Sequence, residues 1–199
     1  MTFTRAIGVS AQFILERIVR ALSLAKIHPN VLTAVGLVIN IAAAVLFGKG
    51  NFVAAGVVVL GAGLFDMVDG RVARASNTVT PFGAFFDSVV DRYSDMALYM
   101  GLLVYYARVG RSLYVVLVAL VMAGSVMISY TRARAESLIP SCKVGFLERP
   151  ERIVLIIIGA LMNRMGPVLW IIGVLSNVTV VHRCIYTWQQ TQGRAPSHS

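Results

Sequence analysis

Four aspartates in this chain are spaced so that together they could hold a divalent metal ion. They follow the pattern D-x2-D-G-x2-A-R-x8-G-x3-D-x3-D and are Asp66, Asp69, Asp87 and Asp91. Every aspartate of the chain lies between Asp66 and Asp95, although the surrounding sequence is apolar enough to span a membrane. Carboxylates inside membrane spans are scarce and usually functional. The cluster therefore predicts a site of chemistry rather than a structural polar network.

A helical hairpin would bring these four carboxylates together. The first pair is spaced i, i+3 and the second i, i+4, so each pair falls on one face of its helix. Residues 75–81 (ASNTVTP) contain turn formers and a proline suited to a helix start. If the chain folds back about residue 78, the two pairs face each other about 13 to 20 Å from the bend. We expect the four carboxylates to converge there.

Converging carboxylates need a counter-charge. Two of them about 4 Å apart repel by about 4 kcal/mol at an effective dielectric constant near 20. A divalent cation relieves this repulsion better than protonation does, and an all-oxygen site without nearby Cys or His suits Mg²⁺ or Mn²⁺ rather than Zn²⁺. Carboxylates that hold Mg²⁺ usually serve a substrate phosphate as well. Gly70 permits close backbone approach, Ala73 is small, and Arg74 can pair with a phosphate oxygen.

The complete pattern resembles the signature of the CDP-alcohol phosphatidyltransferases. Its eight fixed residues are Asp66, Asp69, Gly70, Ala73, Arg74, Gly83, Asp87 and Asp91. The resemblance implies a CDP-diacylglycerol donor, CMP as the leaving group, and two Mg²⁺ ions, with Mn²⁺ as an alternative. It also implies a membrane fold of six helices that forms a homodimer.

The same resemblance assigns roles to individual residues. All four aspartates of the pattern would bind metal, and Asp91 would also act as the general base that takes the proton from the acceptor hydroxyl. The implied donor-binding residues are Pro29, Asn30, Thr33, Asp69, Gly70, Ala73, Arg74 and Gly83. The first three match a P-N-x2-T element before the first span, although the same residues also suit helix capping. Asp95 lies outside the signature, and we expect it to pack against a buried arginine such as Arg92.

Two segments point to the acceptor. Residues 129–136 (SYTRARAE) and 144–152 (VGFLERPER) resemble the phosphatidylinositol-phosphate synthases most closely, including the archaetidylinositol-phosphate synthases. The predicted acceptor-phosphate residues are Arg132, Arg134, Arg152 and Arg183. Three interleaved glutamates, Glu136, Glu148 and Glu151, indicate positioned guanidinium groups rather than a plain polybasic stretch. For any single arginine, a topology signal or a contact with anionic lipid is the alternative.

The elements that must position these groups form an all-α integral membrane protein. Of 199 residues, 57% are hydrophobic and only 14% charged, which lies outside the usual composition of soluble proteins. Six transmembrane helices are expected at 31–47, 52–74, 81–106, 113–130, 148–162 and 167–181. The uninterrupted apolar run of the fifth, 153–162, is too short to span alone, so we expect its charged flank to extend the helix.

Three regions are expected along the chain. Residues 1–28 predict an amphipathic helix on the membrane surface, with a solvent-facing helix as the alternative. Residues 29–188 form the membrane domain, and residues 189–199 form a flexible polar tail. No cleavable signal peptide or internal repeat is apparent.

The charges predict the orientation. If both termini are cytoplasmic, thirteen of the eighteen basic residues lie on that side, and only Lys49, Arg108, Arg111 and Arg164 lie opposite. The positive-inside rule favours this topology, which also places the aspartates within reach of a cytoplasmic nucleotide. The net charge of +9 therefore indicates anionic lipid and phosphorylated substrates rather than nucleic acid. Cys142 and Cys184 also fall on the cytoplasmic side and are expected to be reduced.

The sequence thus predicts an enzyme of the cell membrane that transfers a phosphatidyl group from CDP-diacylglycerol to inositol 1-phosphate. Glycerol 3-phosphate is the alternative acceptor. Residues 142–145 do not match the Gly-Lys-x-x-Thr-type element typical of phosphatidylglycerophosphate synthases. A divalent-cation transporter is the alternative of another class, but it predicts paired, interrupted spans, whereas this chain has one acidic hairpin.

Overall fold

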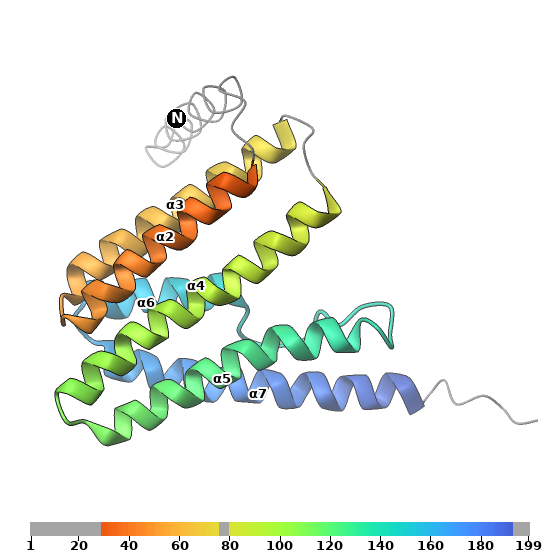
Figure 1. Ribbon diagram of the computed structural model, residues 1–199. Coiled ribbons are helices and arrows are strands. Elements are labelled where there is room, and N and C mark those ends of the chain that lie inside the picture. Colours follow the sequence, from red (N-terminus) through yellow and green to blue (C-terminus); the bar gives the residue numbers. More distant parts are fainter. Residues whose placement is uncertain (1–28, 76–79, 193–199) are drawn as a thin grey trace, which may run out of the picture.

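The computed structural model describes the backbone of residues 29–75 and 80–192, and the side-chain surroundings of the same residues apart from 29 and 67–75. This part is all-helical (Figure 1). Its six helices are α2 (Pro29–Gly48), α3 (Phe52–Ala75), α4 (Pro81–Arg108), α5 (Ser112–Ala135), α6 (Arg149–Leu161) and α7 (Met165–Gln192). The predicted surface helix at residues 1–28 lies outside the described residues.

The two helices that carry most of the site begin at clear sequence signals. Thr80 caps α4, and its Oγ1 accepts a hydrogen bond from the Gly83 backbone N–H at 3.0 Å. Pro81 then takes the first helical position, where a missing N–H costs nothing. Helix α6 follows Glu148, whose backbone N–H donates to the Glu151 carboxylate at 2.9 Å. Because each helix begins at a defined residue, the sides of α4 and α6 on which their charged residues lie are also defined.

The helices pack as two groups joined by α4 and α6. Helix α2 packs against α3 and α4, α5 packs against α7 and α4, and α6 contacts both α3 and α7. Their shared core contains fully buried Phe47, Tyr99, Leu102, Val118 and Ile172. Figure 1 shows that α2 and α4 begin, and α3 ends, at the same end of the bundle. That end is where the spacing of the aspartates was expected to bring them together.

Helix α4 lies against α2 more closely than side chains would allow. A Cβ placed on Gly101 would lie 2.2 Å from the backbone oxygen of Ala44. Glycine at this position therefore permits direct backbone contact between the two helices, as is common where membrane helices pack.

The structure supports a multi-pass membrane protein. Three helices are long and apolar enough to cross a membrane: 30–48, 112–135 and 165–192. The described part of α3 adds a shorter apolar helix, Phe52–Asp66. Helix α4 carries three of the aspartates, Asp87, Asp91 and Asp95. Helix α6 has 13 residues, about 20 Å in length, against about 30 Å of hydrocarbon.

Most helix boundaries lie close to those predicted, but the last helix differs. Helix α7 continues from the predicted end at residue 181 to Gln192, so residues 189–192 are helical rather than part of a flexible tail. The hydroxyls of Thr187 and Thr191 donate to backbone carbonyls one turn earlier, at 2.7 and 3.0 Å. The hydropathy pattern marks only where the apolar side chains end, at about residue 181, whereas the helical backbone continues beyond them. Residues 193–199 lie outside the described part.

Candidate active site

Aspartates from α3 and α4 meet around one arginine of α6. The Arg149 guanidinium lies 2.9 Å from an oxygen of Asp91 and 3.4 Å from oxygens of both Asp66 and Asp95. Asp66 belongs to α3, and Asp91 and Asp95 belong to α4. The fold thus brings the two halves of the aspartate pattern together, as the hairpin predicted, and adds a guanidinium between them.

A glycine of α2 makes room for this cluster. A Cβ placed on Gly36 would lie 2.9 Å from Oδ1 of Asp66. Asp87 lies one helical turn before Asp91 and is exposed. Asp66 therefore packs directly against α2, whereas Asp87 is open to the surroundings.

The residues present fit a divalent metal ion. The donor set is carboxylate oxygen, which suits Mg²⁺ or Mn²⁺. Arg149 shows that positive charge is already held between Asp66 and Asp91. Within the side chains that the structure describes, no three Asp, Glu, His or Cys residues form a metal cluster. The predicted ligand Asp69 lies outside those side chains.

For some of the predicted donor-binding residues the structure describes only the backbone, and for others it also describes the side chain. The backbone of Asp69, Gly70, Ala73 and Arg74 forms the last turns of α3, and their side chains lie outside the described part. Pro29, Asn30 and Thr33 lie on the first turns of α2. Asn30 and Gly83 are neighbours, since a Cβ placed on Gly83 would lie 3.4 Å from Oδ1 of Asn30.

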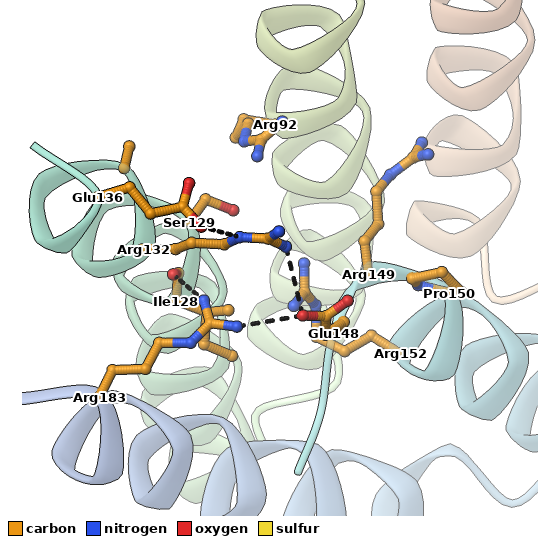
Figure 2. A pocket seen from close by; sticks show the side chains of 11 residues that line it. Arg92, Ile128, Ser129, Arg132, Glu136, Glu148, Arg149, Pro150, Arg152 and Arg183 are labelled. Atoms are coloured by element: carbon orange, nitrogen blue, oxygen red, sulfur yellow. Dashed lines mark hydrogen bonds and ion pairs between the residues drawn. The ribbon is translucent and has the colours of Figure 1, made fainter. Parts of the chain in front are cut away.

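Next to the aspartates is a cavity of about 340 Å³ lined by arginines. Figure 2 shows its side chains, which come from α4, α5, α6 and α7. Its basic lining residues are Arg92, Arg132, Arg149, Arg152 and Arg183. The predicted acceptor residue Arg134 is not among them, and its Nη1 instead donates to Ser137 Oγ at 3.3 Å.

Arg152 is the most unusual of these residues. Its side chain is 2% exposed, and its Nη2 contacts Asp95 at 2.7 Å. Its Nε and Nη1 are buried without a hydrogen-bond partner among the described residues. A buried guanidinium with unmet donors indicates an anionic ligand.

Arg183 and Arg132 meet at a glutamate. Glu148 Oε1 lies 3.3 Å from Nη2 of Arg183 and 3.4 Å from Nη1 of Arg132, and Figure 2 shows it between the two. Arg183 is 1% exposed and also donates to the backbone carbonyls of Val144 and Ile128, at 2.8 and 2.6 Å. Its guanidinium is therefore fixed in direction.

Glu136 lines the cavity and forms an ion pair with Arg132 at 3.2 Å. Burial by itself raises the pKa of Glu136, but hydrogen bonds from Arg132 and from the Cys142 backbone N–H outweigh it and lower that pKa below its usual value. The carboxylate is therefore charged at neutral pH, and Arg132 is held between two anions.

Asp95 pairs with a buried arginine, as expected, but that arginine is Arg152 and not Arg92. Asp95 pairs with Arg152 and Arg149 of α6, not with Arg92, whose Nη1 donates to the Ser88 carbonyl of its own helix. Arg149 and Glu148 belong to the segment 144–152, which was expected to contact the acceptor, but no partner was predicted for either. The only available signal was that the two opposite charges are adjacent at a helix start.

The chain was compared with known proteins. It matches the family model for CDP-alcohol phosphatidyltransferases over residues 26–186. It is 35% identical to an archaetidylinositol phosphate synthase of Pyrococcus horikoshii over 170 residues, covering 85% of this chain and 88% of that protein. It is 36% identical to the phosphatidylinositol phosphate synthase of Mycobacterium tuberculosis over 182 residues, covering 86% and 84%.

Solved structures agree with the sequence comparison. The crystal structure of the Mycobacterium tuberculosis phosphatidylinositol phosphate synthase with CDP-DAG bound matches with a TM-score of 0.82 at 34% identity, covering 88% of this chain and 94% of that one. A structure of the same synthase in complex with manganese and citrate matches with a TM-score of 0.80 at 34% identity, covering 87% and 88%.

Proposed function

This chain belongs to the CDP-alcohol phosphatidyltransferase family, and we propose that it transfers the phosphatidyl group of CDP-diacylglycerol to inositol 1-phosphate, releasing CMP. Because the members of this family are enzymes, the alternative of a divalent-cation transporter is dropped. The donor is supported by the relative whose structure contains CDP-DAG. The names of the relatives support an inositol phosphate acceptor.

The observation that carries the acceptor assignment is the unmet Arg152 guanidinium beside the aspartates. Free inositol would offer it no anion, and serine only a carboxylate beside its own ammonium group. The phosphate of a phosphorylated polyol would meet the donors of Arg152, with Arg132 and Arg183 beside it. Arg134 faces elsewhere and is not part of this assignment. Glycerol 3-phosphate also carries a phosphate, so the polyol itself must be tested.

The reaction uses the two neighbouring charged regions. With its phosphate held by the arginines, the acceptor presents a hydroxyl toward α4. Asp91 takes the proton of that hydroxyl as its oxygen bonds to the lipid-linked phosphorus, and the bond from that phosphorus to the CMP oxygen breaks. Mg²⁺ or Mn²⁺ held by Asp66, Asp69, Asp87 and Asp91 would supply charge compensation for the pyrophosphate and the departing CMP. A relative crystallised with manganese supports this requirement.

The proposal includes the setting of the site. All six helices lie in the cell membrane, and α6 begins within the membrane thickness, where the polar cavity shields its first turn. Both termini and the cavity face the cytoplasm, where the positive-inside rule puts the arginines. The protein is a homodimer, with two metal ions in each site.

The test is release of labelled CMP from CDP-diacylglycerol by detergent-purified protein with Mg²⁺. Inositol 1-phosphate, glycerol 3-phosphate, free inositol and serine are offered separately, and chelation of the metal should stop all release. Release driven by inositol 1-phosphate alone supports the proposal. Release driven by glycerol 3-phosphate instead would leave the family in place and refute the acceptor.

A further inference from the structure

Two adjacent residues at the start of α6 each lie among charges of the opposite sign. Glu148 lies between Arg132 and Arg183, at 3.4 and 3.3 Å. Arg149 lies among Asp66, Asp91 and Asp95, at 2.9 to 3.4 Å. Figure 2 shows that Glu148 points into the arginine cavity and that Arg149 extends away from Arg132 and Arg183. One peptide bond thus separates the counter-ions of two different sites.

Glu148 and Arg149 contact the same groups that a bound phosphate and a bound metal ion would contact. A phosphate bound in the cavity would accept hydrogen bonds from the donors that Glu148 Oε1 now receives. A metal ion bound by Asp66 and Asp91 would compete for the carboxylates that Arg149 now contacts through Oδ2 of Asp66 and Oδ1 of Asp91. Like charges cannot share these places, because a carboxylate beside a phosphate and a guanidinium beside a divalent cation repel each other.

The exposure of the side chains shows which of them can move. Arg183 and Arg152 are 1% and 2% exposed and are fixed by buried partners. Glu148 is 48% exposed, so its ion pairs are weak and it can turn toward water. Arg149 is 27% exposed, similar to Asp66 and Asp91 at 32% and 22%, so part of its side chain also reaches water. Glu148 and Arg149 are therefore not locked in place by full burial, as Arg183 and Arg152 are.

We propose that Glu148 and Arg149 are built-in counter-ions, which hold the acceptor-phosphate pocket and the metal carboxylates before loading and are displaced when phosphate and metal bind. This proposal rests on the proposed function. The counter-ions prevent the clustered like charges from separating the helices, and they compete directly with the incoming ligands.

The phosphate side is tested with Glu148→Gln, which removes the charge but retains the shape of the side chain. The Kd for inositol 1-phosphate is measured by calorimetry on the full chain in detergent, without donor. Because a competing anion is lost, Glu148→Gln should bind three- to tenfold tighter, on the order of the energy of two partly exposed ion pairs. Glu151→Gln is the control: it makes the same charge change one turn into the same helix, at a glutamate that forms no ion pair with an arginine of the cavity. The glutamine can still accept the hydrogen bond from the Glu148 backbone N–H.

The metal side is tested with Arg149→Gln by measuring free Mn²⁺ with electron paramagnetic resonance, again without substrates. Arg149→Gln should bind Mn²⁺ about three- to tenfold tighter. Arg149→Lys, which keeps the charge, should keep the wild-type Kd. Arg164→Gln, an equal charge change at the exposed far end of α6, is the control.

The outcomes separate this proposal from the one on which it rests. If the wild-type protein binds neither inositol 1-phosphate nor Mn²⁺, the assignment of the sites fails. If it binds both, but Glu148→Gln and Arg149→Gln leave the Kd unchanged or weaken it, the sites stand, and the two residues are positioning groups rather than displaceable counter-ions. A tighter Kd that the control substitution also produces is a general charge effect and equally overturns the proposal.

Discussion

Asp91 is the residue whose substitution should separate chemistry from binding. An asparagine at this position cannot accept the proton of the acceptor hydroxyl, so Asp91→Asn should lower the initial rate of CMP release by about 10² to 10⁴-fold. Thermal unfolding in detergent should change little, because the amide can still accept a hydrogen bond from Arg149, which lies at 2.9 Å. A fall of less than threefold in the rate, with the protein folded, would assign the base to another group.

Arg152 should affect both acceptor binding and stability, and the two effects can be separated. Arg152→Gln removes a donor from the acceptor pocket and leaves Asp95, 7% exposed, with only the longer contact to Arg149. The KM for inositol 1-phosphate should rise at least tenfold, and the free energy of unfolding should fall by about 3 to 5 kcal/mol.

The double variant Arg152→Gln/Asp95→Asn provides the control. Removing the buried carboxylate should restore most of the stability, because no charge is then left without its counter-charge. The KM should stay high, since the donor is still missing. If stability and KM recover together, Arg152 acts only through the fold and not on the acceptor.

Individual residues also show what spacing can and cannot predict. The shared face of each aspartate pair could be predicted because residues spaced i, i+3 or i, i+4 lie on the same side of one helix. Arg132 and Arg134 are two residues apart on a helix, so they point to different sides, and only Arg132 lines the cavity. The partners of Glu148 and Arg149 lie on other helices, and no spacing within α6 encodes how those helices pack.

At the scale of elements, the contact between α2 and α4 depends on one glycine. A methyl group on Gly101 would meet the Ala44 backbone at 2.2 Å, and backbone cannot move aside as a side chain can. Gly101→Ala should therefore separate the helices and destabilise the protein by about 1 to 3 kcal/mol. Thermal unfolding in detergent measures this loss.

Gly61 supplies the matched control on the neighbouring helix. A Cβ there meets nothing within 4 Å, so Gly61→Ala should be neutral or slightly stabilising. If both alanine variants unfold at the wild-type temperature, α2 and α4 are packed more loosely than the structure indicates.

Helix boundaries followed from sequence where turn chemistry marks them. Proline begins α4, and Gly50 and Gly110 have positive φ angles of 84° and 69° in the turns before α3 and α5. Hydropathy predicts the extent of the apolar surface but not the length of the helix. The predicted end of the last span at residue 181 is therefore too early, because α7 continues to Gln192. The charged start of α6 was expected to extend its short apolar run, and the helix begins at Arg149.

For the whole molecule, the orientation in the membrane has a direct chemical test. If the proposed six spans hold, the start of α2 and the end of α7 lie on one side of the membrane, and the cavity and Cys184 share that side. Cys184 is exposed and Cys142 is fully buried, so an impermeant maleimide should label only Cys184 in the folded protein. In sealed vesicles with the cytoplasmic face outward, we expect this labelling without detergent.

The opposite side needs its own probe, because labelling of one cysteine could also result from leaky vesicles. Lys49→Cys in a Cys184→Ser background places an exposed thiol in the turn after α2, at the other end of the bundle from the cavity. It should react only after detergent is added to the same vesicles. Labelling of both positions from outside would mean an even number of spans between them, as expected if the 13-residue α6 does not cross. The reverse pattern would place the arginine cavity outside the cell, away from any cytoplasmic nucleotide donor, and would contradict the proposed function as well as the topology.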